Sequence, residues 1–370
     1  MKIGILTSSR ADYGIYLPLL GELKEDNFFE LEVIVFGAHL SRIYGYTLSE
    51  IEQDGYKVVH KVPTLLASDD ELSISTSFGL TSLKFADFWQ NNKYDIVLCL
   101  GDRFEMCAAV QAGIPFGVNY AHLHGGETTL GAIDNVYRHQ ISIASSLHFT
   151  AAEGFTNRLI SILGSKVHVY TVGSLSLDGV DMFKPISKSK FYSKLGISSK
   201  EFILVTFHPE TVDPGLNIEY ARIMRLALKY VAKKYHLIIT MPNADTLGSI
   251  YRSEIHKLVL EYPNGVSCVE NFGKANYFTA MKYSKFLIGN SSSGIVEAAT
   301  FSKYVVNVGN RQGGRLHSLN VINADFNFKS ILSAVNRAVD LGEFNGENIF
   351  YRPNVKVNVK NILKNYYEGL

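Results

Sequence analysis

Several features of specialised proteins are scarce or absent in this chain of 370 residues. It has only 3 cysteines, Cys99, Cys107 and Cys268, and they are widely scattered. This spacing excludes a dense disulfide framework and predicts a reduced, cytoplasmic protein. No apolar run approaches the roughly 18 residues of a membrane span, and the apolar run near the N-terminus is too short for a signal-peptide core. We therefore expect a cytosolic protein that has no membrane partner.

An excess of charge of one sign is missing as well, because 36 Lys and Arg residues nearly cancel 35 Asp and Glu residues. The net charge of +1 gives no general reason to expect nucleic acid as a partner. The phosphate loop G-x-x-x-x-G-K-[ST] is absent, and no G-x-G-x-x-G follows the first apolar run. These absences disfavour P-loop enzymes and dinucleotide oxidoreductases, so any anion must be bound by local geometry.

The chain does contain short apolar runs that alternate with amphipathic stretches. Strands are predicted at 2–7, 31–36, 94–100, 115–121, 147–151, 167–172, 202–207, 235–240, 286–289 and 304–308. Strands that are apolar on both faces and alternate with helices predict parallel sheets covered on both sides. The length predicts two domains, and a Ser/Lys-rich stretch at 174–196 separates the two series of strands. We place the domains at 1–178 and 179–355, with their strand ends facing a central cleft.

In the second half, polar residues follow three predicted strands. Ser291, Ser292, Ser293 and Gly294 link a strand to a helix, where hydroxyls, amides and the helix dipole favour anions. Glu297 follows one turn later and suits ribose hydroxyls, and Arg311 and Arg315 follow the next strand. His208 ends another strand and is either a ligand contact or a turn histidine. These residues predict a phosphorylated ligand on the C-terminal half.

In the first half, the loops after the strands carry charged groups. Ser8 and Ser9 with nearby amides form a candidate anion seat beside Arg10, or else a helix cap beside a surface arginine. Asp102 directly follows a strand that we expect to be buried.

The stretch "HLHGGETTLGAIDNVYRHQ" at 122–140 is the most unusual. Two adjacent glycines, Gly125 and Gly126, would let the backbone approach a ligand closely. Asp134 and Arg138 share one face if the segment from Ala132 is helical, and they could then pair. His122 and His124 alternate as on a strand, so a metal site is conceivable, but no further ligand stands at a characteristic spacing. We therefore predict no metal.

The motifs "TSSRADYG", "GDRFE", "HGGETTLGAIDNVYRH", "FHPET", "GNSSSGIVE" and "NVGNRQGGR" together resemble those of the hydrolysing UDP-N-acetylglucosamine 2-epimerases of sialic acid biosynthesis. The resemblance runs from about residue 2 to about residue 360. It implies a GT-B fold of two Rossmann-like domains, with UDP mostly on the C-terminal domain and the last helix, 356–370, crossing back to the N-terminal one. It implies elimination of UDP to a 2-acetamidoglucal and then hydration with inversion at C2, without a cofactor. It also suggests a homodimer or homotetramer, for which 80–90 is a candidate interface helix.

The resemblance also assigns residues to roles. Asp102, Glu127 and Asp134 are implied as the acids and bases around C2 and the departing oxygen, with Arg138 steadying them or the diphosphate. The implied UDP-binding residues are Arg10, His208, Ser291, Ser292, Ser293, Gly294, Glu297 and Arg311. His124 and Asn243 are candidate substrate contacts.

The sequence departs from some family members, which carry Glu at the position of His124 and one residue fewer before Asp134. An alternative substrate is therefore UDP-2,4-diacetamido-2,4,6-trideoxyglucose, the sugar used for legionaminic-type acids. Other readings are a glycosyltransferase of the same fold, a non-hydrolysing epimerase, and a non-catalytic UDP-sugar-binding regulator.

Overall fold

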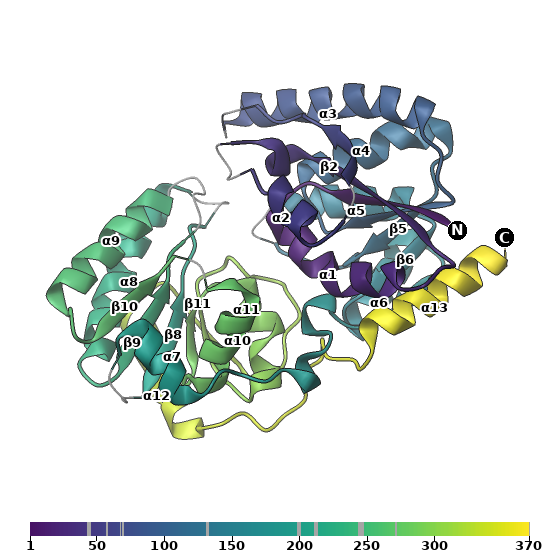
Figure 1. The fold of residues 1–370 in the computed structure, drawn as a ribbon. Helices are drawn as coiled ribbons and strands as arrows, with labels where there is room; N and C mark the ends of the chain where they lie inside the picture. The colour runs from purple at the N-terminus through teal and green to yellow at the C-terminus, as the bar shows by residue number, and fades with distance from the viewer. Residues whose placement is uncertain are drawn as a thin grey trace. The chain divides into compact units, whose positions relative to one another are not determined.

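The computed structural model describes residues 1–42, 46–56, 58–66, 68, 70–130, 133–197, 201–210, 214–242, 248–270 and 272–369. The chain divides into two compact units (Figure 1). Unit 1 comprises Met1–Glu127, Ile133–Gly179 and Phe350–Leu370, and unit 2 comprises Thr128–Ala132 and Val180–Ile349. The chain leaves unit 1 at Gly179, next to the boundary placed at 178, and returns to it at Phe350, before the boundary placed at 355.

Unit 1 is built on a 7-stranded sheet in the order β3-β2-β1-β4-β5-β6-β7. Every strand pair in it is parallel. The strands are β1 (Lys2–Thr7), β2 (Glu30–Phe36), β3 (Val58–Val62), β4 (Ile96–Leu100), β5 (Tyr120–Leu123), β6 (Leu147–Thr150) and β7 (Val169–Thr171). The strand order reverses between β1 and β4, and open α/β sheets bind ligands at such a switch point.

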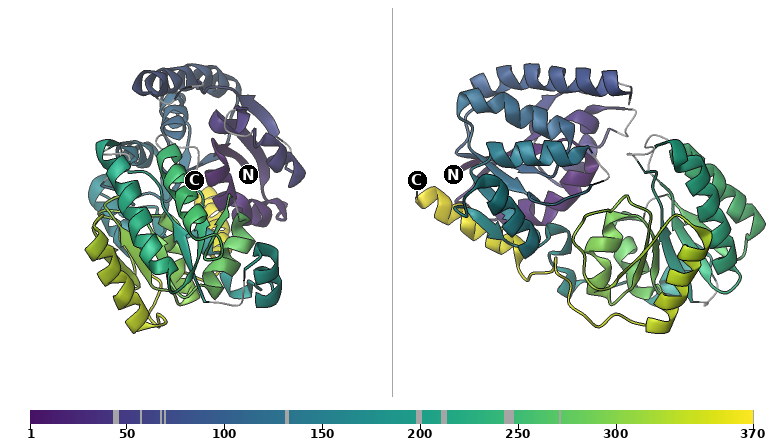
Figure 2. Two further views of the ribbon diagram at one scale, coloured as in Figure 1. Left: turned by 90° about the vertical axis from the view of Figure 1, so that its left-hand side faces the viewer. Right: turned by 180° about the vertical axis from the view of Figure 1, so that it is seen from behind.

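Helices cover both faces of this sheet, as Figures 1 and 2 show. Val33 and Val35 of β2 belong to one core and Ile34 and Phe36 to another, because alternate side chains of a strand point to opposite faces. Helices α1 (Arg10–Lys24) and α2 (Leu48–Gln53) contribute to the first core, and α3 (Glu71–Asn91), α4 (Phe104–Gly113) and α5 (Asp134–Ala144) to the second. The unit also contains α6 (Glu153–Leu163).

The last helix, α13 (Val355–Glu368), also belongs to unit 1. Its buried face, Val355, Val359 and Leu363, joins the core that contains the apolar face of α1. Lys364 pairs with Asp26 at 2.7 Å just beyond the end of α1. The spacing of its buried residues, four apart, is that of one helix face.

Unit 2 repeats the same strand order in a 6-stranded parallel sheet, β10-β9-β8-β11-β12-β13. The strands are β8 (Phe202–Thr206), β9 (His236–Thr240), β10 (Val266–Val269), β11 (Leu287–Gly289), β12 (Val305–Val308) and β13 (Val321–Ala324). The helices are α7 (Lys188–Leu195), α8 (Asn217–Ala232), α9 (Gly248–Glu261), α10 (Gly273–Tyr283), α11 (Ser292–Val296) and α12 (Phe328–Leu341). The switch point of this unit lies between β8 and β11.

Most predicted strands are confirmed, with two kinds of error. The run 115–121 is wrong over its first part, because residues 114–116 form a 3₁₀ turn and β5 begins at Tyr120. The prediction also omitted β3, β10 and β13, each of which is an edge strand. No helix among the described residues is both long enough and apolar enough to cross a membrane.

Candidate functional site

The carboxyl ends of β4 and β5 bring the predicted acids of unit 1 to one edge of the sheet. Asp102 follows β4 and His124 follows β5, and these strands are neighbours. Asp134 begins α5 and Arg138 lies one turn later. Parallel strands end on the same side of a sheet, so residues distant in sequence meet there.

Arg138 pairs with Asp102 across this edge and not with Asp134. The expectation of a pair within α5 is therefore corrected: the guanidinium reaches the strand-end carboxylate. Arg138 is buried while 27% of the Asp102 side chain is exposed. The Nε and Nη1 atoms of Arg138 are buried and find no hydrogen-bond partner among the described residues. Buried donors without partners are costly in a folded protein, so they indicate a place where a polar ligand group fits.

Asp134 lies close enough to Asp102 for their charges to interact. Burial, and then the negative charge of Asp102, raise the pKa of Asp134, while Arg103 and Arg138 oppose that rise. Two carboxyl groups with different environments can divide the roles of acid and base. Asp134 therefore keeps its proton to a higher pH than an ordinary aspartate does.

His124 and Glu127 form a second pair at this edge. His124 Nδ1 lies 2.7 Å from Glu127 Oε1, and both side chains are largely buried. His124 adopts a left-handed backbone conformation with φ of 65°. Its Nε2 atom is buried and has no hydrogen-bond partner among the described residues.

His122 is structural, unlike His124. Its ring nitrogens lie 2.9 Å from Ser142 Oγ and 2.8 Å from the Gly101 carbonyl oxygen. Burial lowers the pKa of His122 to about 3, so the ring is neutral. Because both nitrogens are engaged, His122 has none left for the conceivable metal.

The paired glycines pack against protein and do not open space for a ligand. A Cβ on Gly126, whose φ is 76°, would collide with the carbonyl oxygen of Phe155 in α6. A Cβ on Gly125 would lie 3.1 Å from both His122 and Ser142. The expectation of close backbone approach to a ligand is corrected: these glycines let the loop lie tightly on α5 and α6.

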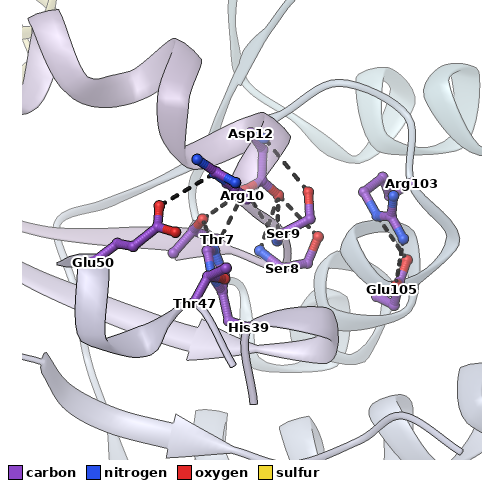
Figure 3. Close-up of polar contacts among 10 residues, drawn as sticks. All are labelled: Thr7, Ser8, Ser9, Arg10, Asp12, His39, Thr47, Glu50, Arg103 and Glu105. Atoms are coloured by element: carbon purple, nitrogen blue, oxygen red, sulfur yellow. Dashed lines mark hydrogen bonds and ion pairs between the residues drawn. The ribbon is translucent and has the colours of Figure 1, made fainter. Parts of the chain in front are cut away.

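The anion seat expected at Ser8 and Ser9 is already filled by the protein (Figure 3). The Asp12 carboxylate accepts hydrogen bonds from the Ser8 amide and Ser8 Oγ, both at 2.9 Å, from the Ser9 amide at 3.1 Å, and from Thr7 Oγ1 at 2.6 Å. Ser9 caps α1 in a capping box with Asp12. Burial would raise the pKa of Asp12, but contacts with His39, Thr7 and Ser8 leave it lowered. An internal carboxylate therefore takes the place expected for an external anion.

Arg10 stays at the rim of this loop. Its Nε lies 3.2 Å from Glu50 Oε2, and 55% of its side chain is exposed (Figure 3). An exposed ion pair of this kind is weak, so the guanidinium can exchange its partner for a phosphate.

Arg103 and Glu105, which belong to the motif GDRFE, form an ion pair. Arg103 donates to Glu105 from Nε at 3.2 Å and from Nη2 at 2.9 Å, and Glu105 is fully buried (Figure 3). A buried carboxylate that holds an arginine with two bonds fixes the position of the positive charge. That charge stands next to Asp102 in sequence and acts on Asp134.

In unit 2 the loops after β8 and β11 meet at the switch point. Asn290 joins them: its Oδ1 accepts from the His208 amide at 2.7 Å and its Nδ2 donates to the His208 carbonyl at 2.9 Å. The Asn290 carbonyl accepts from Arg311 Nη1 at 3.2 Å and from Gln312 at 3.0 Å. Asn290 thus positions two of the predicted UDP-binding residues. It is fully buried, and the sequence analysis did not single it out, although it directly follows a predicted strand.

The serine loop begins helix α11. Ser291 is the N-cap and its Oγ accepts from the Ser293 amide. Ser293 Oγ also lies 2.7 Å from the Tyr277 hydroxyl. Burial, and then the charge of Arg311 in the loop after β12, lower the pKa of His208 to about 4, so its imidazole is neutral. Asn243 lies outside the described residues.

Comparison with known proteins shows the family of the chain. A family model described as UDP-N-acetylglucosamine 2-epimerase matches residues 21–364. The chain belongs to this family. The chain is 35% identical over 327 residues to the Campylobacter jejuni GDP/UDP-N,N'-diacetylbacillosamine 2-epimerase (hydrolyzing), covering 88% of this chain and 85% of that protein. It is 34% identical to the Legionella pneumophila UDP-N,N'-diacetylbacillosamine 2-epimerase (hydrolyzing), covering 92% of this chain and 89% of that protein.

A solved structure of this family has the same fold. The crystal structure of UDP-GlcNAc 2-epimerase from Neisseria meningitidis bound to UDP-GlcNAc matches with a TM-score of 0.81. The match covers 98% of this chain and 100% of that chain at 17% sequence identity. It confirms the predicted fold class, two Rossmann-like domains of the GT-B type.

Proposed function

We propose that the protein is a hydrolysing 2-epimerase that acts on a UDP-linked 2-acetamido sugar. The C2–H bond breaks and its electron pair forms the C1=C2 double bond. The C1–O bond breaks as well, and UDP leaves with the electron pair of that C1–O bond. Water then adds across the double bond, with hydroxyl at C1 and a proton at C2 on the opposite face. The products are UDP and the free 2-epimeric sugar, and no redox cofactor is required.

The single observation that carries the proposal is the charged cluster at the ends of β4 and β5. Asp102, Glu127 and Asp134 supply more acids than one proton transfer needs. Arg138, which pairs with Asp102, has two buried N–H groups that have no hydrogen-bond partner among the described residues. An epimerisation with hydrolysis needs one group to take a proton, another to return one, and a group to place water. A carboxyl group with a raised pKa, such as Asp134, beside further carboxyl groups meets that need.

The nucleotide is assigned to the switch point of unit 2. His208, Ser291, Ser292, Ser293, Gly294, Glu297 and Arg311 are the proposed UDP-binding residues there, with Arg10 of unit 1 as a further diphosphate contact. Neutral hydroxyls and amides beside a fixed arginine suit a diphosphate, and Glu297 suits the ribose hydroxyls. Arginine also matches the charge of UDP as it leaves.

For the sugar we favour UDP-2,4-diacetamido-2,4,6-trideoxyglucose over UDP-N-acetylglucosamine. Relatives at 35% and 34% identity carry the diacetylbacillosamine name, which denotes this 2,4-diacetamido sugar. His124 in place of the glutamate of some family members fits the same choice. UDP-N-acetylglucosamine, which yields N-acetylmannosamine, is the second candidate.

The test is to incubate the protein with each UDP-sugar in deuterated water. We expect UDP release together with a free sugar that carries deuterium at C2, and a higher kcat/KM for the sugar with the 4-acetamido group. UDP release without label at C2 would contradict proton removal there. A nucleotide-linked epimer would indicate the non-hydrolysing reaction, and release only with an added acceptor would indicate a glycosyltransferase. Tight binding without turnover would indicate a regulator.

For assembly, we propose a homodimer through the outer face of α5. Ile133 and Ile143 are 70% and 65% exposed, and Val136 is exposed between them. Beside them lies a groove of about 740 Å³ lined by Ile114, Pro115, Val118 and Ala144. The candidate helix at 80–90 fits less well, because Phe85, Phe88 and Trp89 are in the core. The Ile143→Glu variant should be monomeric by light scattering, whereas Leu260→Glu, on exposed α9, should not change the mass.

The proposed compartment is the cytoplasm, since Cys99, Cys107 and Cys268 are free thiols.

A further inference from the structure

The pair of His124 and Glu127 has a geometry that goes beyond a substrate contact. Glu127 Oε1 lies 2.7 Å from His124 Nδ1, and only 4% of the Glu127 side chain and 15% of the His124 side chain are exposed. A carboxylate at one ring nitrogen holds the proton of a neutral imidazole there. The lone pair of His124 is thereby placed on Nε2.

The Nε2 atom is available for chemistry. It is buried, and no described residue forms a hydrogen bond with it. His122, two residues earlier on the same chain segment, has both ring nitrogens engaged by Ser142 and Gly101. The two histidines are therefore different: the first is satisfied by the fold, and the second keeps a shielded lone pair.

The backbone at His124 gives an independent indication. Its φ of 65° lies in the left-handed region, which costs a residue with a Cβ on the order of 1 kcal/mol. A glycine would adopt this conformation without strain, and two glycines follow directly. A histidine kept in a strained conformation just after a strand is typical of a functional group.

We propose that His124, oriented by Glu127, is the catalytic base that removes the C2 proton of the UDP-sugar. The proton moves from C2 to Nε2, the C–H electron pair forms the C1=C2 double bond, and UDP leaves with the C1–O electron pair. The resulting imidazolium keeps its Nδ1 hydrogen bond to Glu127, whose charge stabilises it. Glu127 is then a positioning residue. The assignment rests on the proposed 2-epimerase function.

Inversion at C2 requires that a second group, among Asp102 and Asp134, return a proton to C2. The proton that returns to C2 must arrive on the face opposite to the one that lost it. A base fixed on one face cannot deliver it, so a second group is required. Asp134, whose pKa burial and Asp102 raise, holds a proton more readily than an ordinary aspartate. His124 with Glu127 thus removes the proton from C2, and Asp134 with Asp102 serves the return of a proton on the opposite face.

The experiment measures the two half-reactions of the His124→Gln variant separately. Elimination is followed as UDP release from the UDP-sugar, and hydration as conversion of the matching 2-acetamidoglucal to the free sugar in the presence of UDP. We expect UDP release to fall at least about 100-fold, while hydration stays within about fivefold of wild type. Glu127→Gln should also lower UDP release strongly, because the amide can donate to Nδ1 and so shift the imidazole proton to Nε2, where the lone pair is needed.

The matched control is His60→Gln. His60 Nε2 lies 3.3 Å from Glu32 Oε2 in the same unit, in a histidine–carboxylate pair on β3 and β2. Both half-reactions should be unchanged in this variant. UDP release by His124→Gln close to the wild-type rate would overturn the assignment, and so would equal loss of both half-reactions. If the wild-type protein releases no UDP from either UDP-sugar, the proposed function itself is wrong.

Discussion

Two serine loops in this protein look alike in sequence but differ in what their amides and hydroxyls bind. Ser8 and Ser9 lie between β1 and α1, at the switch point of one sheet. Asn290 and Ser291 lie between β11 and α11, at the switch point of the other sheet, and Ser292 and Ser293 begin α11. In the first loop the Asp12 carboxylate accepts the amides and hydroxyls that an external anion would use. The first turn of α11 has no acid, and Ser291 alone caps it.

A single residue makes this difference. Asp12 lies three residues after Ser9, where a capping box places an acid. Its carboxylate occupies the amides at the start of the helix. Without such an acid, the start of α11 keeps its partial positive charge, which suits the phosphate binding that we propose there. Consecutive serines before a helix are therefore weaker evidence for phosphate binding when a carboxylate stands in the first helical turn.

The comparison implies that unit 1 acts through its charges, and the Asp102→Asn variant tests this with the largest expected effect. The amide can still accept a bond from Arg138 but cannot take up a proton. We expect kcat for hydration of the 2-acetamidoglucal to fall about 10³-fold, as is typical of removing an acid or base, with little change in UDP affinity. Asp87→Asn, on the exposed face of α3, is the control. A loss below tenfold would remove Asp102 from the chemistry.

The Asp12→Asn variant tests whether the first serine loop serves folding. Its NH₂ group would face the donors of Ser8, Ser9 or Thr7, so hydrogen bonds in a buried site would be lost. We expect the free energy of unfolding to fall by about 3 kcal/mol, measured by urea denaturation, with an unchanged Kd for UDP. Asp70→Asn, at the exposed cap of α3, should lower the free energy of unfolding much less, because asparagine also caps a helix. Weaker UDP binding at unchanged stability would reverse the interpretation.

The same contrast shows how far the sequence could predict the site. The sequence placed Asp102 and His124 near strand ends, because the end of a strand that is apolar throughout is easy to locate, and it placed Asp134 on the helical segment that follows. They could not show that Arg138 would reach Asp102 across β4 and β5 and not Asp134 within its own helix. Partners distant in sequence depend on strand order, which local patterns do not contain. The role of Asn290, which links the loops after β8 and β11, was missed for the same reason.

The fold was predictable where strands are buried on both faces and not where they are half-exposed. The central strands are continuous apolar runs, whereas β3 reads "VVHKV" and β13 reads "VINA", with polar residues mixed in. An edge strand has one free side and needs fewer apolar residues. The first part of 115–121 was misassigned because Gly117, with φ of 65°, ends a turn that apolarity alone does not reveal.

The Arg311→Met variant sharpens the comparison from the side of unit 2. It keeps much of the side-chain length but removes the charge that Asn290 helps to hold. We expect UDP to bind about tenfold more weakly, or about 1.4 kcal/mol, by titration calorimetry, with a smaller dependence on salt. Arg337→Met on the exposed face of α12 should bind UDP as wild type does. An unchanged Kd would place the diphosphate elsewhere.

Acid should reveal a further difference between residues that serve folding and residues that serve chemistry. His122 and His148 are register partners on β5 and β6, and burial lowers their pKa values to about 3 and about 4. An unfolded histidine takes up a proton near pH 6.5, so the unfolded state binds more protons than the folded state below that pH. Each histidine should therefore cost about 1 kcal/mol of stability between about pH 6.5 and 5.5. Urea denaturation at the two pH values should show this loss, and His148→Gln should remove about half of what the pair contributes. A loss that is the same with and without His148 would mean that its ring is protonated in the folded sheet.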